Sequence, residues 1–219
     1  MPATSELNYI AIEGVIGVGK TTFSKMLAEK IDAELINEEV YENPFLSDFY
    51  KNRKRFAFQC QLFFLLSRFQ QQQQLMVRDL FAQRIVSDYL FAKDSIFASI
   101  NLSERELALY DKIAPILAKD VPKPDLAIYL QASTPVLLER IGKRNLSFEK
   151  TIDYEYVEML NNAYDYYFFN YVDTPLLVVK TDGIDFVQNE EHFDDLVERI
   201  HKPISGKVYY APAGNLVNE

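Results

Sequence analysis

Short apolar runs alternate with segments of helical periodicity along this chain of 219 residues. The runs predict strands because each is brief, largely apolar and followed by turn or polar residues. Leu126 to Leu130 gives the clearest run, and Leu176 to Val179 closes the series. The predicted strands occupy residues 7–13, 33–37, 85–87, 125–130 and 176–179.

Helical patterns fill the segments between these runs. Phe58, Leu62, Leu65 and Phe69 recur at helical spacing within a predicted long helix over residues 54–81. That helix contains the glutamine run 70–74, which we expect to form an exposed helical face. The other predicted helices cover residues 22–31, 45–50, 104–118, 153–170 and 190–201, with one more that starts at Thr134 as N-cap and Pro135.

The alternation of strands and helices indicates an α/β fold with a five-stranded parallel sheet flanked by helices. Such sheets bind ligands at the carboxyl ends of their strands. The sequence shows no linker or internal repeat, so we expect a single domain over residues 1–219. Proline and glycine residues after Lys202 predict an irregular C-terminal tail at about residues 203–219.

Composition narrows the functional classes. The net charge of -9 argues against non-specific nucleic-acid binding, which needs a basic surface. Cys60 is the single cysteine and lies in an apolar stretch, so we expect a small core residue and no internal disulfide, as suits the cytoplasm. No apolar run is long enough to span a membrane, and residues 1–6 do not resemble a secretory signal.

The most specific motif follows the first predicted strand. Residues 14–21 match the phosphate-binding pattern G-x-x-x-x-G-K-[ST] and lead into a predicted helix, which is the context that the motif requires. The loop's N–H groups and the helix N-terminus favour phosphate oxygens, while Lys20 reaches the outer phosphates and Thr21 offers a hydroxyl to Mg²⁺. The predicted ATP-binding loop comprises Gly14, Val15, Ile16, Gly17, Val18, Gly19, Lys20, Thr21 and Thr22.

A phosphate loop alone does not distinguish kinases from GTPases, motors or transport ATPases. A small kinase is favoured because the chain is short, has no Asn-Lys-x-Asp guanine-reading motif and carries Arg140, Lys143 and Arg144 before a polar segment. This basic cluster predicts a lid at about residues 140–152 that closes over phosphates. A solvated basic helix end is the alternative.

An acidic segment follows the second predicted strand, near the edge where an acceptor substrate would lie. Phosphoryl transfer to a hydroxyl needs a carboxylate that orients the hydroxyl and takes its proton. Glu38 or Glu39 fits that role by position. Taken by itself, the segment also fits an acidic surface turn.

Together these motifs resemble the deoxynucleoside kinase family, from about residue 7 to about residue 200. Glu38-Glu39-Val40 is similar to the family's Glu-Pro-Val, whose first glutamate is the catalytic base, and this resemblance selects Glu38. The segment 43–50 is similar to the bacterial deoxyadenosine and deoxyguanosine kinases. The resemblance implies the P-loop kinase fold and transfer of the γ-phosphoryl group of ATP, with Mg²⁺, to the 5′-hydroxyl of a deoxynucleoside in nucleotide salvage.

The same resemblance implies an acceptor site. Gln61 is chosen over Gln59 as the base-reading amide because of its interval to Ser67-Arg68. The family's pairing of arginine with aspartate maps to Arg68 and Asp94 and accompanies purine or deoxycytidine substrates. The implied substrate-binding residues are Glu38, Tyr50, Gln61, Arg68, Asp94, Phe97 and Glu149.

On the donor side, the resemblance implies that Arg140 and Arg144 act as catalytic lid arginines. Asp182, Asp185 and Phe186 match the loop that packs on the adenine of ATP. Thr21 and Asp88 would hold the metal. Family members are usually homodimers packed through long helices, and the apolar stretch at residues 54–81 is compatible with this.

One position departs from the family. The Glu-Arg-Ser motif maps to Asp88-Tyr89-Leu90, so the family's arginine, which contacts the base carboxylate, is replaced by Tyr89. Arg84 is a candidate for the missing cation. We therefore expect a purine deoxynucleoside kinase, with deoxycytidine as a further substrate. A thymidylate-like nucleoside-monophosphate kinase and a non-catalytic ATP-binding regulator are the alternatives.

Overall fold

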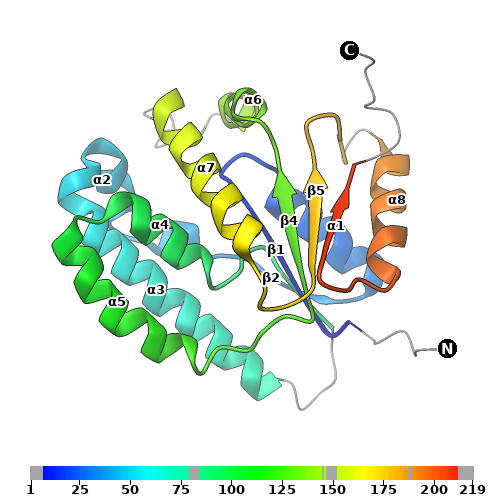
Figure 1. Cartoon of the computed structure of the whole chain (residues 1–219), viewed down its shortest axis with the longest axis horizontal. Coiled ribbons are helices and arrows are strands. Elements are labelled where there is room, and N and C mark those ends of the chain that lie inside the picture. The colour runs from blue at the N-terminus through cyan, green and yellow to red at the C-terminus, as the bar shows by residue number, and fades with distance from the viewer. Residues whose placement is uncertain (1–6, 79–83, 145, 147–151, 187–188, 212–219) are drawn as a thin grey trace.

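A six-stranded parallel sheet forms the centre of the molecule, as seen in a computed structural model that describes residues 7–78, 84–144, 146, 152–186 and 189–211. The strands are ordered β2-β3-β1-β4-β5-β6 (Figure 1). Their bounds are Tyr9–Gly14, Glu34–Ile36, Ile85–Ser87, Leu126–Gln131, Leu176–Lys180 and Lys207–Tyr210 for β1 to β6. β1 lies between β3 and β4, with Ile10 opposite Val86 on one side and Leu126 on the other.

Helices cover both faces of this sheet. In Figure 1, α7 crosses the front face, α1 lies behind the strands, and α2 to α5 gather at one side of the molecule. The helices are α1 (Lys20–Ile31), α2 (Leu46–Lys51), α3 (Arg53–Arg78), α4 (Lys93–Asn101), α5 (Glu104–Ala118), α6 (Thr134–Arg144), α7 (Tyr154–Asn170) and α8 (Glu190–His201), with a short 3₁₀ turn at Val40–Glu42.

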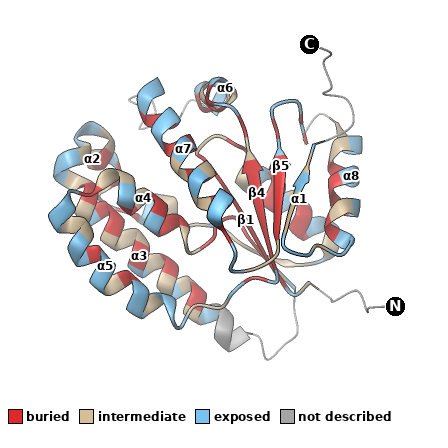
Figure 2. Ribbon diagram, viewed as in Figure 1, coloured by how far each residue is buried: buried red, intermediate tan, exposed pale blue. Residues whose placement is uncertain are grey.

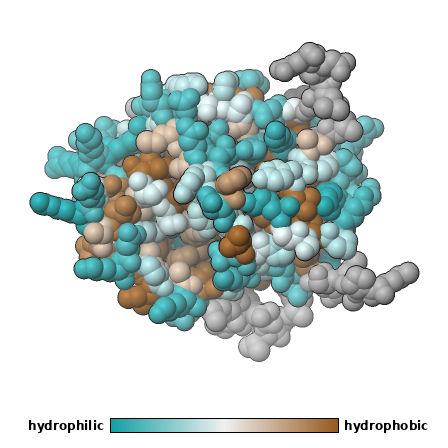
Figure 3. Space-filling view, viewed as in Figure 1, coloured by the Kyte–Doolittle hydropathy of each residue, from teal (hydrophilic) through white to brown (hydrophobic). Residues whose placement is uncertain are grey.

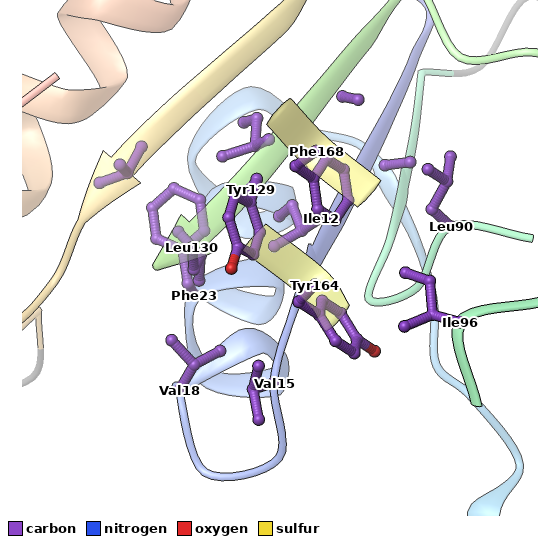
Figure 4. Close-up of a cluster of buried hydrophobic side chains, with 14 of the residues drawn as sticks. Ile12, Val15, Val18, Phe23, Leu90, Ile96, Tyr129, Leu130, Tyr164 and Phe168 are labelled. Carbon is purple, nitrogen blue, oxygen red and sulfur yellow. The ribbon is translucent and has the colours of Figure 1, made fainter. Parts of the chain in front are cut away.

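The core forms where the central strands meet the helices. All six residues of β1 are buried, as expected for a strand covered on both faces, and buried positions line the inner sides of the helices (Figure 2). Between β4 and α7, the rings of Tyr129 and Phe168 stack with centroids 4.2 Å apart (Figure 4). Val15 and Val18 of the glycine loop also enter this core, which anchors the loop to the sheet.

The structure confirms the parallel α/β architecture and adds a sixth strand. The prediction of an irregular tail was wrong over Lys207–Tyr210, which pairs in parallel with β5. Pro203 and Gly206 suggested a turn, but the β-branched and aromatic residues that follow them suit a strand at a sheet edge. Helix α4 was not predicted, and α6 includes Thr134 as its first residue.

The glutamine run corrects another prediction. Gln72 is fully buried, and its amide donates to the hydroxyls of Tyr9 (3.3 Å) and Tyr89 (3.2 Å). Two tyrosine hydroxyls in the core need partners, and a side-chain amide satisfies both. The run is therefore not simply an exposed face, although Gln70 and Gln74 are exposed.

The surface is mixed in polarity. Figure 3 shows hydrophobic side chains scattered among hydrophilic ones on the viewed face. Among the described residues, none of the helices is long and apolar enough to cross a membrane. Cys60 is buried, as predicted, and burial raises the pKa of its thiol to about 12.

Candidate active site

A cleft of about 610 Å³ opens at the carboxyl ends of the central strands. It is the place where a parallel sheet of this kind binds ligands. The cleft brings together most of the residues selected from the sequence. They come from the glycine loop, the segments after β2 and β3, and helices α1, α2, α3, α4 and α6. These lining residues are Ile16, Gly17, Gly19, Lys20, Thr21, Thr22, Glu38, Tyr50, Gln61, Arg68, Asp88, Phe97, Arg140 and Arg144.

The glycine loop has the backbone that the phosphate-binding motif requires. Gly17 has a φ of 88°, and a Cβ atom there would lie 2.7 Å from Ile141 Cγ1 and 2.9 Å from the carbonyl oxygen of Leu137. Gly19, with a φ of 104°, precedes the first residue of α1. Both positions therefore favour glycine, and the loop delivers the N-terminus of α1 to the cleft.

Lys20 lies inside this loop. Its ammonium donates to the carbonyl oxygens of Gly14 (2.6 Å) and Val15 (3.3 Å). Burial and repulsion from Lys93 lower the pKa of Lys20 to about 8, against the opposing attraction of Glu13, Glu38 and Asp88. The negative charge of a phosphate group bound in the loop would raise the pKa of Lys20 again and keep its ammonium protonated.

Asp88 joins the phosphate loop to the acidic segment. Its Oδ2 accepts a hydrogen bond from the Thr21 hydroxyl at 2.8 Å, and its Oδ1 accepts from the backbone N–H of Glu38 at 2.7 Å. The side-chain oxygens of Thr21 and Asp88 thus lie side by side in the cleft, and hard oxygen ligands of this kind suit Mg²⁺. Among the described residues, no group of three or more His, Cys, Asp and Glu side chains forms a metal cage.

The acceptor side is organised by a buried ionic group that we call the Glu38 cluster: Glu38, Arg68, Lys93 and Asp94. Arg68 donates from Nε to Glu38 Oε1 at 2.8 Å, and its Nη1 contacts Asp94 Oδ1. Lys93 Nζ contacts Glu38 Oε2. The side chains of Glu38 and Arg68 are only 7% and 4% exposed, so these pairs are shielded from water.

This environment decides the charge of Glu38. Burial alone would raise the pKa of Glu38, but Lys93 and Arg68 outweigh that effect and lower the pKa to about 2. Glu38 is therefore a carboxylate at neutral pH and is able to accept a proton. Glu39 is exposed and does not line the cleft, so the geometry favours Glu38 of the two alternatives.

Gln61, Tyr50 and Phe97 complete the acceptor side. The Gln61 amide donates to the carbonyl oxygen of Asp94 at 2.7 Å, which fixes its orientation, whereas Gln59 is exposed. Tyr50 and Phe97 line the same cleft. Asp94 lies behind Arg68 and is not part of the lining; its second oxygen accepts from the Tyr110 hydroxyl at 2.7 Å.

The predicted lid residues are placed only in part. The Arg140 guanidinium donates to the carbonyl oxygens of Val18 (3.1 Å) and Thr181 (2.7 Å), so it ties the glycine loop to the segment after β5. Arg144 is exposed at the end of α6 and lines the cleft. Glu149 lies outside the described residues, as does most of the segment after Arg144.

The segment after β5 was predicted to pack on adenine. Asp182 Oδ1 accepts from the backbone N–H of Ser133 at 2.8 Å, and the ring of Phe186 packs against Phe23 with centroids 5.0 Å apart. Phe186 is buried in the core, and neither it, Asp182 nor Asp185 lines the cleft. The contact of this segment with adenine stays a prediction.

A comparison with protein families decides the class. The model of the family described as "Deoxynucleoside kinase" matches residues 10–205. This chain belongs to the deoxynucleoside kinase family. It is 40% identical over 201 residues to a deoxyguanosine kinase of Bacillus subtilis (strain 168), covering 90% of this chain and 97% of that one. It is 37% identical to a deoxyadenosine kinase of Dictyostelium discoideum, covering 85% and 76% of the two chains.

Solved structures agree with this assignment. The fold is similar to that of a deoxyadenosine kinase from M. mycoides with bound dCTP, with a TM-score of 0.75 and 29% identity over 88% of this chain and 98% of that one. The same enzyme with bound dATP gives a TM-score of 0.76. This chain is thus an ATP-dependent deoxynucleoside kinase.

Within this deoxynucleoside kinase, the position that departs from the family lies in the core. Tyr89 is fully buried and does not line the cleft. The proposal of Arg84 as the missing cation was wrong: Arg84 precedes β3, at the opposite end of the sheet, and donates to the carbonyl oxygen of Ile31 at 3.4 Å. Carboxyl and amino ends of a strand point to opposite edges, so Arg84 does not reach the cleft.

Lys93 is a cleft residue that sequence analysis missed in this deoxynucleoside kinase. It lines the cleft and contacts Glu38, yet no motif singled it out. Its one sequence signal was its place directly before Asp94, five residues after Asp88. A lysine beside an aspartate at the start of a helix is ordinary, so this signal carried little weight.

Proposed function

We propose that this enzyme transfers the γ-phosphoryl group of ATP to the 5′-hydroxyl of a purine deoxynucleoside, with deoxycytidine as a further acceptor. The observation that carries the proposal is the cleft itself. Lys20 of the phosphate loop and the Glu38 carboxylate line one cavity of about 610 Å³, so a donor and an acceptor can meet in it. Its volume is in the range of small-molecule sites, roughly 300–1,000 Å³.

On the donor side, the loop's N–H groups and the N-terminus of α1 hold the phosphates of ATP. Lys20 turns its ammonium from the carbonyl oxygens of Gly14 and Val15 to the outer phosphates. Arg144 stands at the mouth of the cleft and closes over the phosphates from the predicted lid, about residues 140–152. Arg140 holds the glycine loop and the segment at Thr181 together while the lid closes.

Thr21 and Asp88 are the residues that would hold Mg²⁺. When bound, the ion supplies positive charge to the β- and γ-phosphates. Asp88 is only 5% exposed and also accepts a hydrogen bond from the backbone N–H of Glu38. One carboxylate would therefore orient both the bound Mg²⁺ and the segment that carries the base. This shared partner sets the distance between the two halves of the site.

On the acceptor side, the deoxynucleoside lies along α3 with its 5′-hydroxyl at Glu38. Glu38 takes the hydroxyl proton as the 5′-oxygen bonds to the γ-phosphorus, and the bond from that phosphorus to the bridging oxygen breaks to release ADP. Tyr50 and Glu149 bind the 3′-hydroxyl, and Phe97 stacks on the base. Lys20 and the lid arginines stabilise the charge on the transferring group.

Purine selectivity is assigned to Gln61, whose orientation is fixed by Asp94. One amide hydrogen bonds the Asp94 carbonyl oxygen, which leaves the second hydrogen and the amide oxygen for a base edge. An amide can pair in this way with adenine or guanine. The names of the relatives, a deoxyguanosine kinase and a deoxyadenosine kinase, support purine substrates.

A phosphorylation assay tests the proposal. Wild-type enzyme is incubated with ATP and Mg²⁺ and with each deoxynucleoside, each ribonucleoside and each deoxynucleoside monophosphate in turn. We expect 5′-monophosphates from deoxyguanosine or deoxyadenosine at the highest kcat/KM. Products from monophosphates alone would support a monophosphate kinase, and no product from any acceptor would support an ATP-binding regulator.

We also propose that the enzyme is a homodimer. Large hydrophobic side chains are exposed on the neighbouring helices α3 and α5, among them Leu66, Leu109 and Ile116. Exposed apolar groups of this size favour burial against a second copy. Light scattering of the wild type should give twice the chain mass of 25.4 kDa, and Ile116→Glu should reduce it to the mass of one chain.

A further inference from the structure

Lys93 is a buried lysine in the cleft that none of the motifs accounts for. Its ammonium contacts Oε2 of Glu38, while Arg68 holds Oε1 with its Nε at 2.8 Å. Each oxygen of the Glu38 carboxylate therefore has its own cation. Two cations on opposite oxygens fix the plane of the carboxylate more firmly than either cation alone.

The position of Lys93 is costly for stability. It is the first residue of α4, where the positive end of the helix dipole disfavours a cation. It is also 7% exposed, so its charge has lost most of its hydration. An apolar side chain would avoid both costs, which points to a role for the charge at this position.

Lys93 completes the ion pairs of the Glu38 cluster. Arg68 is shared between the carboxyl groups of Glu38 and Asp94, whereas Lys93 pairs with Glu38. Without Lys93, the Oε2 oxygen of Glu38 would lose the cation that holds it, and Arg68 would still be divided between two carboxyl groups. The orientation of the Glu38 carboxylate therefore depends on Lys93.

Among the described residues near Tyr89, where the chain departs from the family, no other cation occupies the place of the missing arginine. Tyr89 turns into the core toward Gln72, and Arg84 lies at the opposite edge of the sheet. Lys20 is committed to the phosphate loop. Lys93 is near enough to Lys20 for repulsion between them to lower the pKa of Lys20, so its charge stands at the junction of donor and acceptor.

We infer that Lys93 is a positioning residue for phosphoryl transfer: it orients the Glu38 carboxylate toward the 5′-hydroxyl. In this role it takes over from the arginine that Tyr89 replaces. The inference rests on the proposed role of Glu38 as the base. It assigns the cation from a different element, since Lys93 belongs to α4 and position 89 to the turn after β3.

The test compares Lys93→Met, which keeps the length and removes the charge, with Lys93→Arg, which keeps the charge. Lys123→Met is the matched control, because Lys123 is exposed and pairs with Asp173 away from the cleft. For each variant we measure kcat, KM for ATP and for the deoxynucleoside, and the midpoint of thermal unfolding.

Lys93→Met should lower kcat roughly 100-fold with KM for ATP little changed, since loss of a correctly placed base costs about 10²–10⁴-fold. Lys93→Arg should regain most of the activity, because it keeps a cation beside Oε2 of Glu38. Lys123→Met should match the wild type.

A kcat within threefold of wild type for Lys93→Met, or no recovery of kcat in Lys93→Arg, would overturn the inference. Should Lys93→Met fail to fold, Lys93→Gln carries the same comparison; failure of both would assign Lys93 a purely structural role and also overturn it. Glu38→Gln separates the two proposals. If Glu38→Gln keeps full turnover, the base assignment fails; if it is inactive while Lys93→Met is normal, only the present inference fails. The double variant should lose no more than Glu38→Gln alone.

Discussion

The two halves of the cleft are built in opposite ways. The donor half is one continuous segment, residues 14–21, whose backbone bends around the position of the phosphates. The acceptor half is assembled from side chains of distant segments: Glu38 follows β2, Arg68 belongs to α3, and Lys93 and Asp94 begin α4. The first half depends on glycine conformations, and the second on buried ion pairs.

This difference affects how each half tolerates change. A glycine loop fails when a side chain blocks its backbone, because the constraint is steric. The Glu38 cluster fails when a charge is lost, because a remaining charge is then buried with one partner fewer. Asp88 connects the halves through Thr21 and the backbone of Glu38. Because the two halves fail for different reasons, substitutions in the donor half and in the acceptor half should give separable effects.

The largest effect should come from the base. Glu38→Gln keeps the size of the side chain and removes proton acceptance, so kcat should fall roughly 1,000-fold, equivalent to about 4 kcal/mol. KM for ATP should hardly change, because the donor half stays intact. Steady-state kinetics check this expectation.

Glu39→Gln is the control for that substitution, since the neighbouring Glu39 is exposed. It should behave as wild type. A normal turnover for Glu38→Gln would show that the acceptor half has a different base.

The next effect should come from the backbone of the donor half. Gly17→Ala forces a φ of 88° on a residue with a Cβ atom that meets Ile141 and Leu137, so the free energy of unfolding should fall by about 2–3 kcal/mol. Denaturant unfolding measures this, and calorimetric titration should find that deoxynucleoside binding survives.

Gly142→Ala provides the comparison within α6. A Cβ atom there meets nothing within 4 Å, and the φ is not positive. This variant should match the wild type or be more stable by up to about 1 kcal/mol. Equal losses for Gly17→Ala and Gly142→Ala would contradict the steric account of the loop.

A pH titration should separate the halves by their charges. Burial and Lys93 lower the pKa of Lys20 to about 8, while Lys93 and Arg68, against burial, lower the pKa of Glu38 to about 2. As pH rises through about 8, free enzyme loses the charge on Lys20, so kcat/KM for ATP should fall by up to tenfold per pH unit.

The fall of kcat should occur at a higher pH than the fall of kcat/KM for ATP, because bound phosphates raise the pKa of Lys20 again. Initial rates from pH 6 to 10, at low and at saturating ATP, give both profiles. A kcat/KM for ATP that stays constant through pH 9.5 would contradict the lowered pKa.

The smallest effect should come from the outer edge of the Glu38 cluster. Tyr110→Phe removes the hydrogen bond from the Tyr110 hydroxyl to Asp94 (2.7 Å), which should cost about 1 kcal/mol of unfolding free energy. The exposed Tyr154, whose hydroxyl donates to Glu158, supplies the control Tyr154→Phe, and we expect no measurable change. An equal loss in both variants would show that Asp94 does not need Tyr110.

Most of the fold was predictable because its signals are local. The runs that form β1, β3, β4 and β5 are short and apolar, and the bounds of α5 and α8 agree with the periodicity. β6 was missed because the turn residues before it dominated the composition of the tail. α4 was missed because its nine residues contain few signals beyond Ile96 and Phe97.

The candidate site was predictable to a similar degree. The glycine loop, Glu38, Gln61 and Arg68 meet in the cleft as expected. The ring of Phe186 packs on Phe23 in the core, and the contact of its segment with adenine stays a prediction. Lys93 had no local pattern, because its partner Glu38 is 55 residues away.

The sequence by itself determined the phosphate loop, since eight adjacent residues contain both the backbone freedom and the chemical groups that phosphate binding needs. It also determined the parallel sheet, because short apolar runs that predict strands alternate along the chain with segments of helical periodicity. Only the tertiary structure decided which cation accompanies Glu38 and that Tyr89 and Gln72 face the core. The physical reason is that burial and ion pairing depend on segments far apart in the chain, and no single segment contains both partners.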